Sequence, residues 1–126
     1  MKNYLSLEKL EAYKLARVLS DIAWKVYENL DWQIKKMLGS QFVGSVDSTG
    51  ANIAEGYGRF HYLDKVKFYY NARGSLLESR HWLDLLRERK LIDKDLYLEY
   101  LNIYNELRAV LNGLIKSAML QKDSKP

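Results

Sequence analysis

Polar side chains recur at helical spacing in two parts of the chain, and they are the first candidates for chemistry. Steps of four and three residues place each set on one face of a helix. The upstream row is Gln41, Ser45, Ser48, Asn52 and Glu55, and the downstream row is Asn71, Ser75 and Glu78. Two carboxylates, Glu55 and Glu78, make a catalytic or ligand site one interpretation. A structural hydrogen-bond network is the other, and we favour it because buried polar sets in bundles often specify register.

The two polar rows meet if the chain turns back near Arg59. Antiparallel pairing of the two helices then sets Ser48 opposite Asn71 and Ser45 opposite Ser75. Small residues surround the rows and let the two backbones approach closely: Gly39, Gly44, Gly50, Ala51, Ala54 and Gly74. An unsatisfied buried polar group costs about 1–3 kcal/mol. We therefore expect the rows to be buried and hydrogen-bonded to each other.

The sequence contains few residues that could bind a metal ion or act as a nucleophile. Cysteine is absent, and the two histidines are His61 and His81. The stretch from Glu78 to His81 spells Glu-x-x-His, a motif of di-iron bundles, but those sites need the motif on two helices together with further glutamates. The motif occurs once here. We therefore expect no catalytic residue, no metal site, no cofactor and no enzymatic activity.

Excess positive charge gathers between residues 61 and 90, where seven Lys and Arg face four Asp and Glu. The candidate contacts for nucleic acid are Arg59, Lys65, Lys67, Arg73, Arg80 and Arg87. Aromatic residues such as Phe60 and Tyr70 lie among them, and this mixture suits phosphate contact together with base stacking. Charge alone favours a solvated or interface surface instead, because Asp84 lies within one helical turn of both Arg80 and Arg87.

Four amphipathic helices with short connections must position these residues. We expect the helices at about residues 7–30, 32–55, 62–90 and 93–120. Asp93 is the expected N-cap of the last helix. The second helix is expected to end at Gly56-Tyr57-Gly58, with glycine in the left-handed conformation. The predicted fold is an all-α, up-down-up-down four-helix bundle.

The remaining organisation of the chain is simple. Its single proline is Pro126, and no linker rich in proline, glycine or serine divides it. We expect one domain over residues 1–120, followed by a polar tail over residues 121–126. No apolar run is long enough to span a membrane, which favours a cytoplasmic protein.

Two motifs of the chain resemble the signature of a bacterial family. The motifs are Asn52-Ile53-Ala54-Glu55-Gly56-Tyr57-Gly58-Arg59 and, after Phe68, Ala72-Arg73-Gly74-Ser75-Leu76 with Glu78. The chain resembles the four-helix-bundle proteins encoded in intervening sequences of 23S rRNA genes, and Gln41 and Ser48 fit the same pattern. It departs from these relatives over residues 42–44, where they commonly carry an arginine.

The resemblance implies a short bundle that assembles as a ring-shaped homopentamer and has no established enzymatic activity. It also implies similarity to the accessory protein of diversity-generating retroelements, a basic pentameric barrel that binds nucleic acid and a partner reverse transcriptase. Apolar residues on more than one helix face, among them Trp24, Phe68 and Tyr70, separately predict self-association.

We therefore expect a non-enzymatic homo-oligomer that binds RNA or DNA through a basic face of the third helix. A nucleic-acid-processing protein is a further expected partner. The alternative is a structural module for protein–protein assembly that binds no nucleic acid.

Overall fold

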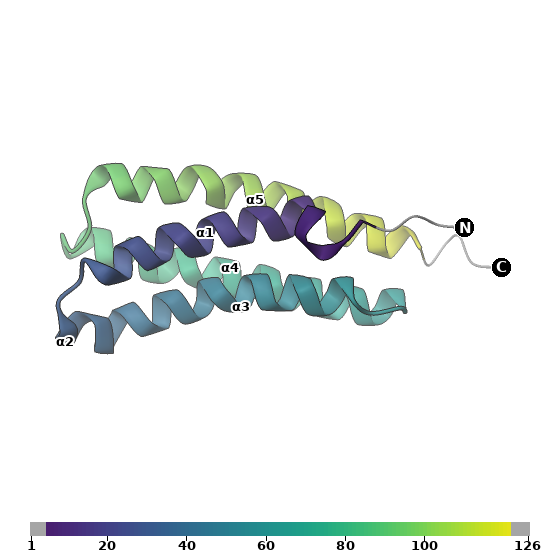
Figure 1. The fold of residues 1–126 in the computed structure, drawn as a ribbon, viewed down its shortest axis with the longest axis horizontal. Coiled ribbons are helices and arrows are strands. Elements are labelled where there is room, and N and C mark those ends of the chain that lie inside the picture. Colours follow the sequence, from purple (N-terminus) through teal and green to yellow (C-terminus); the bar gives the residue numbers. More distant parts are fainter. Residues whose placement is uncertain (1–4, 122–126) are drawn as a thin grey trace.

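Helices make up most of residues 5–121, the part of the chain that the computed structural model describes. The elements in chain order are η1 (Leu7–Lys9), α1 (Glu11–Glu28), α2 (Trp32–Ile34), η2 (Lys35–Gly39), α3 (Ser40–Tyr57), α4 (Tyr62–Glu88) and α5 (Lys94–Leu120). The four long helices run alternately in opposite directions (Figure 1). Helices α3 and α5 each pack against both α1 and α4. The described residues contain no strand, and the expected four-helix bundle is confirmed.

One apolar core lies along the axis of the bundle. The predicted stripe of the first helix is buried throughout: Ala12, Leu15, Ala16, Leu19, Ile22, Ala23, Val26 and Leu30. Across the bundle, the ring of Phe42 in α3 lies 5.3 Å from the ring of Tyr100 in α5. Both residues are 0% exposed. This buried aromatic pair links α3 and α5, which lie diagonally across the bundle from each other.

Two aspartates begin helices in the expected way. The carboxylate of Asp93 accepts a hydrogen bond of 2.7 Å from the backbone N–H of Leu96, which confirms Asp93 as the N-cap of α5. Asp31 caps α2 in the same manner, through the N–H of Ile34 at 3.0 Å. Both caps satisfy backbone donors that a helix N-terminus would otherwise leave unpaired.

The first two helices differ in detail from the sequence-based expectation. Leu10 is extended and separates η1 from α1, so the first long helix begins at Glu11. The second helical segment contains a π-helical turn, η2, between α2 and α3. A Cβ atom on Gly39, the last residue of this turn, would lie 2.9 Å from Cδ2 of Tyr27. Glycine therefore lets the Tyr27 ring pack directly on the helix backbone.

The end of α3 is not formed as expected. Among the described residues no glycine has a positive φ, and the C-cap Gly58 has a φ of −77°. Gly56 is instead required for packing, because a Cβ there would lie 2.7 Å from Cε1 of Tyr69 in α4. Tyr69 is 1% exposed, and burial raises the pKa of its hydroxyl to about 12. The α3 backbone thus rests against a tyrosine ring that has no room to move.

Substitution Gly56→Ala is expected to lower the free energy of unfolding by about 1–3 kcal/mol, because the added methyl group overpacks this contact. Urea denaturation followed by circular dichroism measures the change. Gly74→Ala is the matched control, since nothing lies within 4 Å of a Cβ at Gly74. It should raise stability by about 0.5–1 kcal/mol through helix propensity. Equal stability of the two variants would contradict the close packing of Gly56.

Two expectations concern features outside the bundle core. Residues 122–126 of the predicted polar tail lie outside the described residues. Within the described part of the chain, none of the helices combines the length and the apolar character needed to cross a membrane.

Candidate nucleic-acid interface

The arginines of α4 lie at its seam with α5 and are half-buried. The guanidinium of Arg73 donates to Oδ1 of Asn112 at 3.0 Å and lies 4.8 Å from the centre of the Tyr70 ring. Arg87 donates to the backbone carbonyl of Ile92 at 3.2 Å, in the turn before α5. The seven-residue spacing therefore places these arginines on one side of α4, as predicted, but that side faces a neighbouring helix.

Arg80 lies between Arg73 and Arg87 in the most connected part of the seam. Its Nε donates to both carboxylate oxygens of Asp84, at 3.0 and 3.1 Å, and its guanidinium lies 5.6 Å from the centre of the Tyr104 ring. The hydroxyl of Tyr97 donates to the same carboxylate at 2.9 Å. Burial and this hydrogen bond raise the pKa of Tyr97. The guanidinium is consequently held in one orientation.

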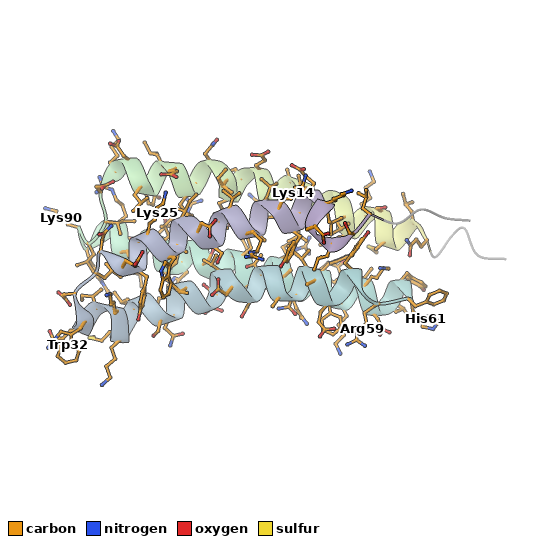
Figure 2. The ribbon with its side chains drawn as sticks, viewed as in Figure 1. Lys14, Lys25, Trp32, Arg59, His61 and Lys90 are labelled. Carbon is orange, nitrogen blue, oxygen red and sulfur yellow. The ribbon has the colours of Figure 1, made fainter. Side chains whose placement is uncertain are left out.

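Arg59 and Lys67 both lie near Phe68, at the turn that joins α3 to α4. Their cationic groups are 4.9 and 5.7 Å from the centre of the Phe68 ring. Arg59 also forms a salt bridge of 3.0 Å with Glu55, one turn earlier on α3. This pair is about half exposed on both sides, and such pairs add little stability. Figure 2 shows Arg59 at the same end of the bundle as His61.

Lys65 was a predicted phosphate contact, but in the structure it binds backbone carbonyls of its own chain. Its ammonium group donates to the backbone carbonyls of Gly56 and Tyr57 at 3.3 and 3.0 Å, and it lies 5.5 Å from the centre of the Tyr57 ring. Burial lowers the pKa of Lys65. The last carbonyls of α3 are thereby satisfied by a cation from α4.

The two polar rows meet as predicted, but most of their residues are exposed. Gln41, Ser45 and Ser48 of α3 line a shallow groove of about 220 Å³ with Ser75 and Glu78 of α4. Ser45 is buried, Asn52 and Ser75 are half-buried, and the remainder are exposed, namely Gln41, Ser48, Glu55, Asn71 and Glu78.

The expected hydrogen-bond network between the rows is therefore corrected. Ser45 donates to the Phe42 carbonyl at 2.8 Å, and Asn52 donates to the Ser48 carbonyl at 2.8 Å, both within α3. Glu78 accepts from the indole N–H of Trp82 at 2.9 Å within α4. Across the described residues no hydrogen bond joins one row to the other. The reason is that α3 turns the neighbouring apolar stripe toward the core and leaves its polar row at the edge.

Substitution Glu78→Ala is expected to change the free energy of unfolding by no more than about 0.5 kcal/mol, as is usual for exposed positions. Chemical denaturation of wild type, Glu78→Ala and Glu78→Gln measures the effect, and the glutamine variant keeps an acceptor for Trp82. A loss above about 2 kcal/mol in the alanine variant alone would show that this row is buried.

The polar contact that does join two helices in the core was not anticipated. Ser79 is 0% exposed, accepts a hydrogen bond from the Tyr100 hydroxyl at 2.6 Å and donates to the Leu76 carbonyl at 2.6 Å. Burial raises the pKa of Tyr100. The sequence does carry a signal for this site, since Ser79 stands between Leu76 and Leu83 at core spacing.

A second groove, of about 380 Å³, lies between α1 and α3. Its floor consists of small residues, including Ala16, Gly50 and Ala54. On its rim the Arg17 guanidinium donates to the Tyr13 hydroxyl at 3.0 Å. No residue of this groove was among the predicted sites. Its titratable side chains are Tyr13, Arg17 and Asp47, and Asp47 accepts a hydrogen bond of 2.7 Å from the Ser20 hydroxyl, so these polar groups are already partnered within the chain.

The Glu-x-x-His motif is not part of a metal-binding cluster. Glu78 and His81 are both exposed, and the His81 ring lies 4.8 Å from the Trp82 ring at an angle of 69°. Over residues 5–121 there is no group of three or more His, Asp or Glu side chains placed to hold a metal ion.

Comparison with known proteins decides the family. The model of the family described as 23S rRNA-intervening sequence protein matches residues 8–113. The chain belongs to this family. A solved structure from Bacteroides thetaiotaomicron VPI-5482, a protein with unknown function from the S23 ribosomal protein family, has the same fold, with a TM-score of 0.77. That protein is 24% identical, and the similarity covers 83% of this chain and 98% of that one. None of the curated proteins compared with the chain matches it.

The motifs that resembled this family surround the α3–α4 contact. The first motif spans the end of α3 and contains Gly56, whose backbone packs against the Tyr69 ring. The second motif contains Ser75, which lines the groove opposite Ser45. The motif residues thus shape the closest packing between two helices and the groove beside it.

Proposed function

We propose that this chain is a non-enzymatic, cytoplasmic homo-oligomer that binds RNA or DNA through the cations of α4 and of the turn before it. The observation that carries the proposal is the fixed orientation of Arg73 and Arg80. Each guanidinium is hydrogen-bonded at about 3.0 Å and lies over a tyrosine ring, yet remains partly open to solvent. A pre-oriented guanidinium loses less freedom on binding a phosphate than a flexible one does.

The six candidate contacts form two groups. Arg73, Arg80 and Arg87 follow the α4–α5 seam, and Arg59, Lys65 and Lys67 gather at the α3–α4 turn. We assign phosphate contact to the first group and to the two exposed cations of the second, Arg59 and Lys67. Lys65 acts indirectly, because it holds the end of α3 in place.

Self-association is supported by the apolar surface of the single chain. Among residues 5–121, twelve large apolar side chains are exposed: Leu5, Val18, Trp24, Trp32, Met37, Phe60, Leu63, Tyr70, Leu77, Leu98, Met119 and Leu120. Soluble monomers rarely expose a contiguous apolar patch of more than a few hundred Å², so any of these side chains that adjoin one another favour burial between subunits. The resemblance to ring-forming relatives makes a cyclic homopentamer the proposed assembly. A nucleic-acid-processing protein is the proposed further partner.

One observation favours the second candidate, an assembly module that binds no nucleic acid. Each arginine of the α4–α5 seam already has an acceptor within the chain: Asn112 for Arg73, Asp84 for Arg80 and the Ile92 carbonyl for Arg87. In that case the arginines would only join α4 to α5.

Sedimentation velocity and fluorescence anisotropy with labelled RNA and DNA test both candidates. The proposed function predicts a particle larger than a monomer and binding that weakens steeply as salt increases. An oligomer that binds neither nucleic acid at low salt would support the assembly module. A monomer would contradict both candidates.

A further inference from the structure

We propose that the turn between α3 and α4 is a platform on which unpaired bases stack, so that the ligand is a single-stranded nucleic acid. The platform comprises Arg59, Phe60, His61, Lys67 and Phe68. This inference rests on the proposed nucleic-acid function and adds to it the strandedness of the ligand and the site that selects it.

Phe60 is the most exposed of the large apolar side chains in the described part of the chain, at 83%. Its ring meets the His61 ring edge to face, with centroids 5.4 Å apart, and no other aromatic ring of the described residues contacts it. An exposed phenylalanine in a short turn contributes little to folding, because folding does not remove its surface from water. Its open ring faces are suited to a flat, apolar partner.

Two cations lie over the neighbouring Phe68 ring. Arg59, in the turn after α3, is 4.9 Å from the ring centre, and Lys67, in α4, is 5.7 Å from it. The opposing carboxylates are Glu55, which pairs with Arg59, and the exposed Asp64. Because the Arg59–Glu55 pair is exposed, a phosphate can replace the carboxylate at small energetic cost.

The combination selects single strands for a geometric reason. A base within a duplex has both faces covered by its neighbours, whereas a base in a single strand can turn out and stack on an aromatic side chain. Phosphates that follow the stacked base would meet Lys67 and then the arginines along α4. The turn therefore supplies stacking and the helix supplies charge.

The opposite end of the bundle provides a natural comparison. Trp32 is also exposed, at 69%, and Figure 2 shows it at the other end of the molecule from Arg59 and His61. Nearby, Trp24 and Tyr27 stack on each other with centroids 5.1 Å apart, so each covers one face of the other. Lys35 lies over the Tyr27 ring at 5.3 Å. The Trp24 and Tyr27 rings are thus partly covered, whereas Trp32 is exposed like Phe60, so a Trp32 variant tests whether any exposed aromatic side chain would serve.

The experiment measures binding of labelled oligouridylate RNA and oligothymidylate DNA of about ten nucleotides, and of an RNA duplex of equal length. The proteins are the full chain, Phe60→Leu and the control Trp32→Leu. Leucine keeps an apolar side chain but removes the aromatic face. We expect Phe60→Leu to bind both single strands about tenfold more weakly, with thermal stability unchanged. Trp32→Leu should bind like wild type, and the duplex should bind more weakly than either single strand.

The other outcomes separate this inference from the proposed function. Wild type that binds no nucleic acid would overturn both. Wild type that binds while Phe60→Leu matches Trp32→Leu would overturn the stacking platform alone, as would a preference for duplex. A loss confined to one of the two single strands would also contradict the stacking platform, because every base has a face that stacks on an aromatic side chain.

Discussion

The Phe42→Ala variant is expected to lose about 3–5 kcal/mol of unfolding free energy, the loss typical of removing a buried phenylalanine ring. Phe42 is 0% exposed and packs against Tyr100, so the cavity would open between α3 and α5 at the centre of the core. For a chain of this size the midpoint of thermal unfolding should fall by roughly 10–20 °C. Differential scanning calorimetry measures the shift.

Phe60→Ala is the matched control, since it removes the same ring from a position that is 83% exposed. We expect its unfolding free energy to stay within about 0.5 kcal/mol of wild type. If the two alanine variants melted together, the assignment of Phe42 to the core would be wrong.

The second large effect concerns binding. The triple variant Arg73→Gln, Arg80→Gln, Arg87→Gln is expected to lose nucleic-acid affinity on the order of a hundredfold at low salt. Each phosphate contact to a single strand contributes about 0.7 to the slope of log affinity against log salt, so the slope should flatten by about 2. Glutamine places an amide nitrogen at about the position of the arginine Nε, so it retains a donor for Asp84 at position 80, whereas it is too short to replace the Nη1 contacts with Asn112 and Ile92. Anisotropy titrations over a range of salt concentrations measure both quantities.

A second triple variant controls for total charge. Lys14, Lys25 and Lys36 are exposed on other surfaces of the bundle, and their replacement by glutamine removes the same three charges. We expect this variant to keep nearly the full salt slope. An equal loss in both triple variants would show that net charge, not the α4–α5 seam, holds the ligand.

The elements of the fold could be predicted because their causes are local. The apolar stripe of α1 and the N-cap Asp93 depend on spacing and on side chains a few residues apart. Four such helices with short connections leave few packing arrangements other than an antiparallel bundle. The family could be recognised for a related reason, since its motifs are contiguous in the sequence.

The candidate site was harder to predict from the sequence than the fold, as Lys65 illustrates. Composition shows a cation near aromatic residues, but only the structure shows its ammonium group on the carbonyls of Gly56 and Tyr57. Gly56 gives a similar lesson. Its residue type predicted a left-handed helix end, whereas the reason for glycine is the Tyr69 ring that arrives from another helix.

By itself the sequence determined the helices, their antiparallel order and the residues that the α3–α4 groove brings together. Tertiary structure alone decided how deeply the polar row of α3 is buried. A rotation of α3 about its axis by a fraction of a turn would have buried the row from Gln41 to Glu55 instead of leaving most of it exposed. That rotation depends on all contacts with α1 and α4 at once, including the close approach at Gly56. Helical spacing specifies which residues share a face, but the fit of whole surfaces decides where that face points.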